Sequence, residues 1–526
     1  MKSKQSVSYL VTLVVLLGAL LVGSGALAQG GRVVLPIVDD PIFNQLHPNA
    51  YVESVMVNRV LFNGLVKLGK DFDTAPDLAE SWEASDDGLT WTFHLRDDVV
   101  WHDGEPFTAD DVIFTFEEVI LNPEVGANNA RIYANVEEVV AVDDHTVEFH
   151  LASPFASLGV NLAYNTPILP AHVLRGTDVM NNNDFNRQNP VGTGPFALAQ
   201  YEPGQRVVLE PNDDYFLGAP VLDEVVYEII PDPNSQLARL LAGELDVMII
   251  DNPITTQRLR NNNALEITTS NQLNYYWAGP NLSRTPFDRK EFRQALSYAI
   301  DRKVMIENVL LGFASPATGP ISPVLQTFYT DDVQTYDYDP ERARELLEEA
   351  GFTFADDGTA LLDGEPFSFT ITYPNVQVFA QVGTLLQQYF RDIGIGTELQ
   401  GLEFNSFVSE ALVPRDFDML LGWWVTPPDP DIFPYYHSSA AEGGNNATMY
   451  RSDEADALLQ RGRETSDPQE RVQIYHELQQ LLAEDLPMIY LWYPDEIVAM
   501  DANLEGVPEA IGYRPALQYI HEWRME

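Results

Sequence analysis

Two periods of apolar residues recur along this chain, one typical of strands and one typical of helices. Residues 89–95 alternate apolar and polar side chains directly after an Asp87-Gly88 turn signal, which predicts a half-buried strand in a hairpin. Thr108 precedes Asp110 and Asp111, and this order predicts a capped helix with acidic residues in its first turn. The apolar stripe of that helix consists of Val112, Ile113, Phe116, Val119 and Ile120.

The same alternation of helix and strand patterns continues through the rest of the chain. Residues 234–242 predict a helix that ends at Gly243, and 247–250 predict a strand. Further predictions are an amphipathic helix over 289–306, a helix that Asp339-Pro340 opens and Gly351 ends, a strand over 368–373, a helix over 378–391 and a strand over 418–422. Strands alternating with helices favour open, mostly parallel sheets in more than one α/β lobe. In such sheets ligands bind at the strand ends or between lobes.

The N-terminus carries the pattern of an export signal. Lys2 and Lys4 precede an almost wholly apolar run over 11–22, and residues 26–28 (Ala-Leu-Ala) offer a small-residue cleavage site. That run is shorter than the roughly 20 residues that a membrane-spanning helix needs. We therefore expect residues 1–28 to be a signal peptide and the mature chain to be periplasmic or extracellular.

Composition and charge narrow the range of partners. The 526 residues, 45% of them hydrophobic, are enough for roughly two to four domains. The 79 acidic residues outnumber 30 Lys and Arg, and the net charge of -49 repels nucleic acid and anionic lipid headgroups. The same charge opposes self-association, so we expect a monomer. No cysteine is present, which excludes disulfides, thiolate chemistry and a lipidated cysteine anchor.

No motif in the sequence argues for catalysis. A G-x-x-x-x-G-K match ends at Lys70, but Asp71 follows where a phosphate loop needs Ser or Thr. The nine histidines show no metal-ligand spacing, and no G-x-S-x-G or H-E-x-x-H motif occurs. Close carboxylate pairs are uninformative among so many acidic residues, so a secreted hydrolase stays a disfavoured alternative. We expect no cofactor, no metal and no enzymatic activity.

One long segment and six later blocks resemble a single known family. Residues 78–119 (LAESWEASDDGLTWTFHLRDDVVWHDGEPFTADDVIFTFEEV) strongly resemble the signature of family 5 of the bacterial extracellular solute-binding proteins. Members of this family are dipeptide, oligopeptide and nickel receptors of ATP-driven importers. The collinear blocks that continue the resemblance are NPVGTGPF (189–196), NDDYFLGAPVLDEVVYEII (212–230), LLAGELDVMI (240–249), RTPFDRKEFRQALSYAIDR (284–302), YDPERARELLEEAGF (338–352) and FDMLLGWWVTPPDPD (417–431).

The resemblance implies a two-lobed α/β receptor of the periplasmic-binding-protein type, with an extra subdomain inserted in lobe one. By this analogy lobe one comprises 29–70, 191–275 and 505–526, the inserted subdomain 71–190, and lobe two 276–504. The chain is then expected to cross between the lobes near 275 and 505. Closure about such a hinge buries the ligand, and the ligand selects the closed form because it touches both lobes. The expected protein partner is the membrane permease of an ABC importer.

The segment after the predicted strand 418–422 is the family's recognition segment. In its peptide receptors a Gly-Trp pair is followed, three residues after the Trp, by an aspartate that pairs with the peptide's amino terminus. Here Gly422-Trp423 matches, but Thr426 stands at the aspartate position. A neutral hydroxyl does not replace a buried ion pair, which weakens the peptide hypothesis. Asp429 is the candidate that could replace the missing carboxylate in a shifted pose.

Aromatic residues surround the recognition segment. The residues expected to contact the ligand are Trp423, Thr426, Asp429, Trp424, Tyr435, Tyr275 and Trp277 in or near lobe two, with Asn44 and Leu46 in lobe one. Relatives lay backbone groups against the ligand around these lobe-one positions. Since neighbouring side chains on a strand point to opposite faces, at least half of the aromatic residues are expected to pack inside. His47 stands where many relatives have aspartate and is not expected to bind a metal.

Three functions remain open at this point. An oligopeptide receptor is favoured by the frequency of peptide receptors in the family. An oligosaccharide receptor is the alternative, because Thr426 is neutral and flat aromatic surfaces suit sugar rings. A sensor or chaperone would use the same cleft without transport, and the sequence does not separate it from a transport receptor.

Overall fold

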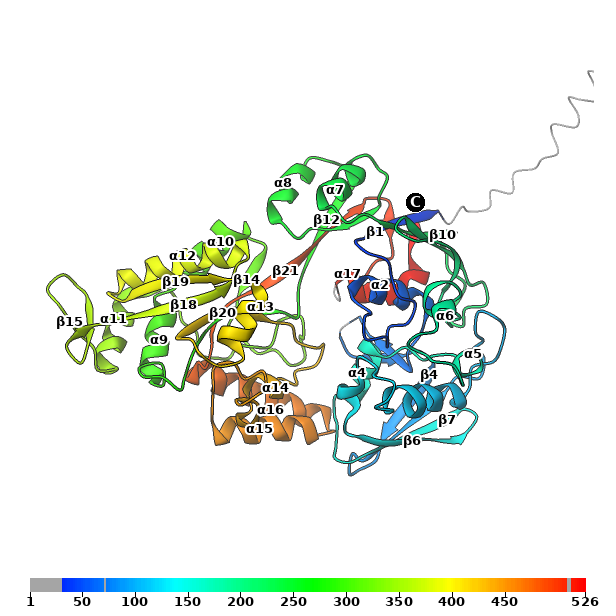
Figure 1. Ribbon diagram of the computed structural model, residues 1–526, viewed down its shortest axis with the longest axis horizontal. Coiled ribbons are helices and arrows are strands. Elements are labelled where there is room, and N and C mark those ends of the chain that lie inside the picture. Colours follow the sequence, from blue (N-terminus) through cyan, green and yellow to red (C-terminus); the bar gives the residue numbers. More distant parts are fainter. Residues whose placement is uncertain (1–30, 71, 509–511) are drawn as a thin grey trace, which may run out of the picture.

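The chain folds into two lobes that are joined by two neighbouring strands, β12 (Leu265–Asn271) and β21 (Ile489–Asp501) (Figure 1). The computed structural model describes residues 31–70, 72–508 and 512–526. The predicted signal peptide, 1–28, lies outside the described residues. Across those described ranges, none of the helices combines the length and the apolar character that a membrane crossing requires.

Lobe one is built on a four-stranded sheet in the order β1-β10-β9-β8, in which β1 and β10 are parallel. The strands are β1 (Arg32–Ile37), β8 (Phe196–Glu202), β9 (Arg206–Pro211) and β10 (Glu224–Ile229). The predicted helix over 234–242 is confirmed as α7 (Pro233–Leu241), whose Leu237 and Leu240 pack on Val34 and Val226. Smaller elements of this lobe are β2 (Val66–Leu68), β3 (Thr74–Pro76), β11 (Val247–Ile249), β22 (Leu504–Glu505), β23 (Arg524–Met525), α2 (Val52–Leu61), α8 (Thr256–Leu259) and α17 (Tyr513–Ala516).

A second sheet, antiparallel throughout, is inserted between β3 and β8. Its order is β4-β5-β7-β6, with β4 (Ala79–Ala84), β5 (Thr90–Leu95), β6 (Val136–Asp143) and β7 (Thr146–Leu151). The predicted hairpin is confirmed, because Asp87 accepts hydrogen bonds from the Ser85 hydroxyl (2.6 Å) and the Leu89 N–H (3.1 Å) in the turn before β5. The helices of this part are α3 (Ala109–Ile113), α4 (Leu158–Asn165), α5 (Ala171–Leu174) and α6 (Asn183–Arg187).

The helix predicted after Thr108 is confirmed, with one change of geometry. The Thr108 N–H donates to the Asp111 carboxylate at 3.0 Å, which fixes the first turn of α3. Beyond Ile113 the chain continues as a π-helix over Phe114–Ile120. Of the predicted stripe, Val112, Phe116, Val119 and Ile120 are buried, and Ile113 is half-buried.

Lobe two is built on an eight-stranded sheet that reaches into lobe one. Its order is β11-β21-β13-β20-β18-β19, and β12 and β14 also pair with β21. Only β18 with β19 and β18 with β20 are parallel pairs, so the prediction of mostly parallel sheets is wrong. Four of the antiparallel pairs involve β21, which crosses between the lobes and pairs with β11, β12, β13 and β14, and β13 also pairs antiparallel with β20. The remaining strands are β13 (Tyr275–Pro280), β14 (Ala314–Pro316), β15 (Thr353–Phe354), β16 (Ala360–Leu362), β17 (Glu365–Pro366), β18 (Ser368–Pro374), β19 (Gly396–Leu402) and β20 (Met419–Trp424).

Most predicted helices of lobe two are confirmed, and one is not. Asp339 caps α11 by accepting a hydrogen bond from the Arg342 N–H at 2.9 Å, and Gly351 follows with a positive φ of 91°. The single helix predicted over 289–306 is wrong, because Asp301 accepts from the Val304 N–H at 3.0 Å and starts a new helix there. The helices are α9 (Lys290–Tyr298), α10 (Arg302–Leu310), α11 (Pro340–Glu349), α12 (Gln377–Asp392), α13 (Phe404–Ser406), α14 (Phe433–Tyr436), α15 (Asp453–Glu464) and α16 (Pro468–Asp485).

The two passages between the lobes lie side by side. The first passes from β12 to β13 through residues 272–274, and the second lies inside β21 near Pro494, whose carbonyl accepts from the Gln272 N–H at 2.9 Å. The crossings expected near 275 and 505, and the domain boundaries that depend on them, stay predictions. Residues 495–501 of β21 pair with β12. One uninterrupted strand therefore belongs to both lobes.

Candidate functional site

In each lobe, strands point with their carboxyl ends toward the passages between the lobes. In lobe two, β20 runs antiparallel to β13 and ends where β13 begins, and β18 runs parallel to β20. In lobe one, β11 runs toward the passages, because Ile249 pairs with Val498 and Val247 with the more distant Met500. The carboxyl ends of these strands therefore face the opposite lobe. This edge is where α/β proteins bind ligands.

Exposed apolar side chains follow the strand ends of lobe two. Val376 lies after β18, Phe404 after β19 and Val425 after β20, and they are 49%, 49% and 57% exposed. Exposed apolar residues gathered on one edge are typical of a binding surface. We call these three residues the apolar edge.

A row of stacked rings runs from the core of lobe two to this apolar edge. Tyr276 stacks on buried Trp492 with ring centroids 4.7 Å apart and on Trp423 at 6.3 Å, and the planes differ by 16° and 22°. Trp423 also contacts Phe404 at 6.2 Å and Phe379 of α12 at 5.7 Å. The row places half-buried Trp423, a predicted site residue, beside exposed Phe404. Phe379, Phe404 and Trp492 were not among the predicted residues.

The other predicted aromatic residues lie on the opposite face of the same strands. Tyr275 and Trp277 are buried, and the Tyr275 hydroxyl forms a hydrogen bond with that of Tyr436 at 3.0 Å. Trp424 is half-buried between Trp277, at 5.6 Å, and Tyr435, at 4.9 Å. As ligand contacts these residues stay predictions, and in this conformation Tyr275 and Trp277 pack inside lobe two.

Thr426 and Asp429 both have partners inside the protein. The Thr426 hydroxyl donates to the Leu273 carbonyl at 2.6 Å, which ties the recognition segment to the first passage between the lobes. Asp429 is 2% exposed and accepts two hydrogen bonds from Arg471, at 2.6 and 2.8 Å. Burial lowers the pKa of Arg471, but the carboxylate of Asp429 raises it by more, so the pKa lies above its ordinary value. A role for either residue in ligand binding stays a prediction.

Asp431 of the same segment is also paired. It accepts from the Arg463 Nε at 2.8 Å, and burial raises its pKa. The Arg463 guanidinium lies 4.3 Å from the centre of the Phe433 ring. The backbone carbonyl of Arg463 accepts a hydrogen bond from the Ala156 N–H, in the inserted part of lobe one, at 3.0 Å. The recognition segment is therefore linked to a contact between the two halves of the molecule.

The two lobe-one residues predicted from the sequence are both buried. Asn44 accepts from the Leu46 N–H at 3.0 Å and donates to Asn186 at 3.3 Å, and Leu46 packs in the core. His47 accepts from the Asn49 N–H at 3.0 Å, and burial lowers its pKa. The described residues contain no group of three or more His, Asp or Glu side chains placed to hold a metal ion.

The exposed side of lobe one at the strand ends is formed by residues that the sequence did not single out. A pocket of about 100 Å³ lies at the carboxyl ends of β1 and β11. Val38 and Val52 border it and are 44% and 46% exposed. Arg514 of α17 brings a positive charge to the same pocket. The signal that could have located the pocket is the predicted strand over 247–250, because Asp251, which directly follows it, borders the pocket.

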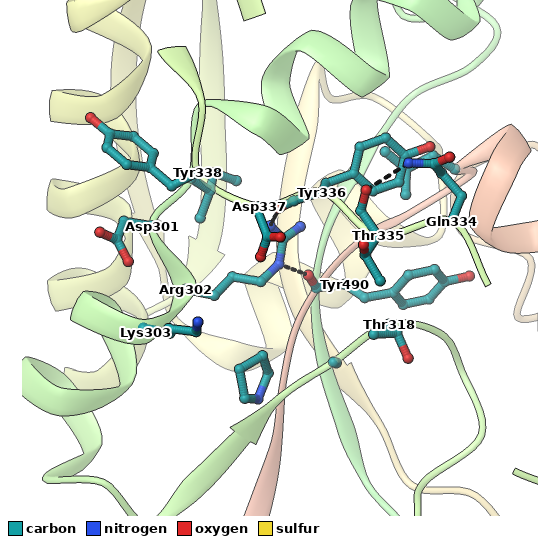
Figure 2. A pocket seen from close by; sticks show the side chains of 14 residues that line it. Asp301, Arg302, Lys303, Thr318, Gln334, Thr335, Tyr336, Asp337, Tyr338 and Tyr490 are labelled. Atoms are coloured by element: carbon teal, nitrogen blue, oxygen red, sulfur yellow. Dashed lines mark hydrogen bonds between the residues drawn. The ribbon is translucent and has the colours of Figure 1, made fainter. Parts of the chain in front are cut away.

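A larger cavity of about 410 Å³ lies elsewhere in lobe two, beside the start of α10 (Figure 2). Its only arginine, Arg302, donates to the carbonyls of Tyr490 (2.7 Å), Ser297 (3.2 Å) and Tyr336 (3.2 Å). None of its lining residues belongs to the strand ends that face lobe one. This cavity is therefore separate from the edge described above.

Two lobes, paired passages and facing strand ends define the class of two-lobed solute-binding receptors. The comparisons with known proteins agree. The family model for bacterial extracellular solute-binding proteins, family 5 (middle part), matches residues 73–445, and the chain belongs to this family. It is 34% identical over 491 residues to the oligopeptide-binding protein AppA of Bacillus subtilis, which covers 92% of this chain and 90% of that protein.

Two further comparisons support the same conclusion. The chain is 31% identical to the dipeptide-binding protein of Escherichia coli, over 82% of this chain and 83% of that protein. The structure of Bacillus subtilis AppA in complex with a nonapeptide superimposes with a TM-score of 0.71 at 33% identity, covering 95% of this chain and 99% of that one. These matches confirm the two-lobed α/β fold predicted from the sequence.

Proposed function

We propose that this protein captures oligopeptides between its two lobes and delivers them to the membrane permease of an ABC importer. The observation that carries the proposal is the apolar edge with the stacked row behind it, placed at strand ends that face lobe one. Such a surface binds apolar side chains of an extended peptide without reacting with them. Relatives that cover most of the chain are named as oligopeptide- and dipeptide-binding proteins.

The recognition segment supports binding through the side chains of the peptide. Because Asp429 and Asp431 are paired with arginines and Thr426 is bonded to Leu273, this segment offers no carboxylate free of a partner. We therefore propose that Trp423 and the three residues of the apolar edge make the main contacts in lobe two. The oligosaccharide alternative is not favoured, since the relatives are named for peptides.

Three finer statements belong to the same proposal. The protein releases its ligand chemically unchanged and is not an enzyme. It acts after export, in the periplasm or outside the cell, without a lipid anchor, since it contains no cysteine. It works as a monomer, because one pair of facing edges suffices for one ligand.

Native mass spectrometry of the protein purified from its own host tests the ligand class. We expect co-purified masses that correspond to peptides and disappear on denaturation. A ladder of masses spaced by hexose units contradicts the proposal. Labelled peptides incubated with the protein should be recovered intact, and turnover would show an enzyme instead.

Small-angle scattering tests the mechanism. Addition of a peptide that binds should reduce the radius of gyration, because closure brings the lobes together. Trp423→Ser should weaken binding of peptides with apolar side chains about tenfold or more, since a buried aromatic contact of this size is lost. Val413→Ser, which removes another exposed apolar side chain outside the apolar edge, is the matched control. An unchanged scattering profile with a bound peptide contradicts the hinged mechanism.

A further inference from the structure

A buried guanidinium that has no carboxylate partner among the described residues lies in lobe one. Arg59, near the end of α2, is 7% exposed and donates through Nη2 to the Tyr164 carbonyl at 3.2 Å. Its guanidinium also lies 4.9 Å from the centre of the Tyr164 ring. Nε and Nη1 are buried and have no hydrogen-bond partner among the described residues. Burying a positive charge with unpaired N–H groups costs several kcal/mol unless an anion compensates for it.

A second guanidinium, that of Arg514 on α17, lies in the same part of lobe one. Burial lowers the pKa of Arg59, and the positive charge of Arg514 lowers it further. Tyr164 raises this pKa but does not offset the lowering. The Arg514 Nε is also buried without a partner among the described residues, while the side chain as a whole is 43% exposed. Among the described residues Arg514 pairs with Glu496, whose Oε1 lies 3.7 Å from Nη1 and whose Oε2 accepts from the Tyr513 N–H at 2.7 Å. Arg514 thus has one carboxylate, Glu496, at 3.7 Å, and Arg59 has none within ion-pair distance among the described residues.

The two arginines lie beside the pocket at the strand ends of lobe one. Arg514 lines that pocket, together with Val52 and Met56 of α2. Arg59 follows Met56 by three residues and so lies on the same face of the helix. One partly exposed guanidinium, that of Arg514, therefore lies in the wall of the pocket, and Arg59 lies about one helical turn beyond Met56, which also lines it.

The other charged groups around the pocket limit what can bind there. Glu53 and Asp251 also border it, so a second negative charge on the ligand would be repelled. A single carboxylate has the charge and the planar geometry that a guanidinium binds through two parallel hydrogen bonds.

We propose that Arg59 and Arg514 form a subsite in lobe one for a single carboxylate of the ligand. That this carboxylate belongs to a peptide rests on the proposed function. The carboxylate is the peptide's C-terminus or an Asp or Glu side chain. Lobe two then binds the apolar side chains and lobe one the charge, so that a peptide must touch both lobes to gain both contributions, which favours closure.

Affinity measured by calorimetry for paired peptides tests the subsite. The probes are Ala-Phe-Ala-Phe-Ala as the free acid, the same peptide as the C-terminal amide, and the amide with a central Asp. We expect Arg514→Gln to weaken binding of the free acid roughly 10- to 100-fold and to leave the amide unchanged. The Asp-containing amide shows whether a side-chain carboxylate is accepted in place of the C-terminus. Arg451→Gln, which removes a 53% exposed arginine elsewhere, is the matched control.

Equal losses for acid and amide, or an equal effect of Arg451→Gln, overturn the subsite. If no peptide binds at all, the proposed function fails, and the subsite is then judged with acetate alone. In protein labelled with 15N-arginine, acetate should shift the Nε–H resonances of Arg59 and Arg514, and Arg514→Gln should abolish the shift at Arg59. Absence of any shift at both residues in the folded wild-type protein overturns the proposal independently of peptide binding.

Discussion

The buried pair of Asp429 and Arg471 is expected to hold the recognition segment on α16. The perturbation is Asp429→Asn, which keeps the shape of the side chain and removes its charge. The two side chains are 2% and 8% exposed, and the third donor of Arg471, Nε, binds the Gly462 carbonyl at 2.9 Å. After the substitution Arg471 is a buried cation with no opposite charge in contact, because Asp431 is already paired with Arg463.

The size of the effect follows from this burial. Removing one partner of a buried ion pair costs about 3 to 5 kcal/mol, because the other charge stays buried. For a lobe of roughly 200 residues this lowers the melting temperature by roughly 6 to 20 °C. Differential scanning calorimetry should show the change in the transition of lobe two, while the transition of lobe one stays in place.

Two further variants complete this experiment. Asp429→Asn combined with Arg471→Met should recover most of the lost stability, because the uncompensated charge is then removed. Asp431→Asn is the matched control and should cost about 1 kcal/mol or less, since Arg463 is 35% exposed and can turn to water. A melting temperature of Asp429→Asn within about 1 °C of wild type would refute the reasoning.

Three other predictions concern separate parts of the molecule. Burial raises the pKa of Asp77 from 3.8 to about 6, so its contribution to stability is fullest below about pH 4 and is lost as the pH rises to 6. Urea unfolding should show this loss, about 3 kcal/mol, and Asp77→Asn should remove it. A Cβ at Gly422 would lie 2.6 Å from the buried Trp277 ring, so Gly422→Ala should cost about 1 to 3 kcal/mol by thermal melting, and an unchanged melting temperature would contradict this contact. Ala156→Pro removes the N–H that donates to Arg463, and scattering without ligand should show a larger radius of gyration, whereas an unchanged radius would mean that this contact does not hold the halves together.

Local structure was largely predictable because its signals are local. The cap at Asp339 and the turn at Asp87-Gly88 each depend on residues within a few positions, and both form as predicted. The break at Asp301 was missed because an apolar helical pattern runs through it and only the cap marks the new start. Strand direction could not be derived, since it depends on the pairing of β21 with strands more than 200 residues away.

The candidate site was predictable only in part. The sequence indicated Trp423, but it could not show that Tyr276 and Phe404 stack in the same row, since the three belong to separate segments. It indicated Thr426 and Asp429 because of their place in the recognition segment, while their partners, Leu273 and Arg471, are distant in sequence. Conversely, nothing in the sequence singles out Arg59, because a buried cation without a carboxylate is recognised only once its surroundings are known.

The strand β21 has a consequence for how this molecule can be re-engineered. Its 13 residues form one strand, the pairing with β13 shifts register at Leu491, and residues on either side of Pro494 serve different lobes. Insertion of a single residue there would turn every later side chain to the wrong face and so misfold lobe one while leaving lobe two intact. Chimeras that exchange lobes between relatives should therefore transplant this strand whole, with its partner β12, and place their junctions in loops.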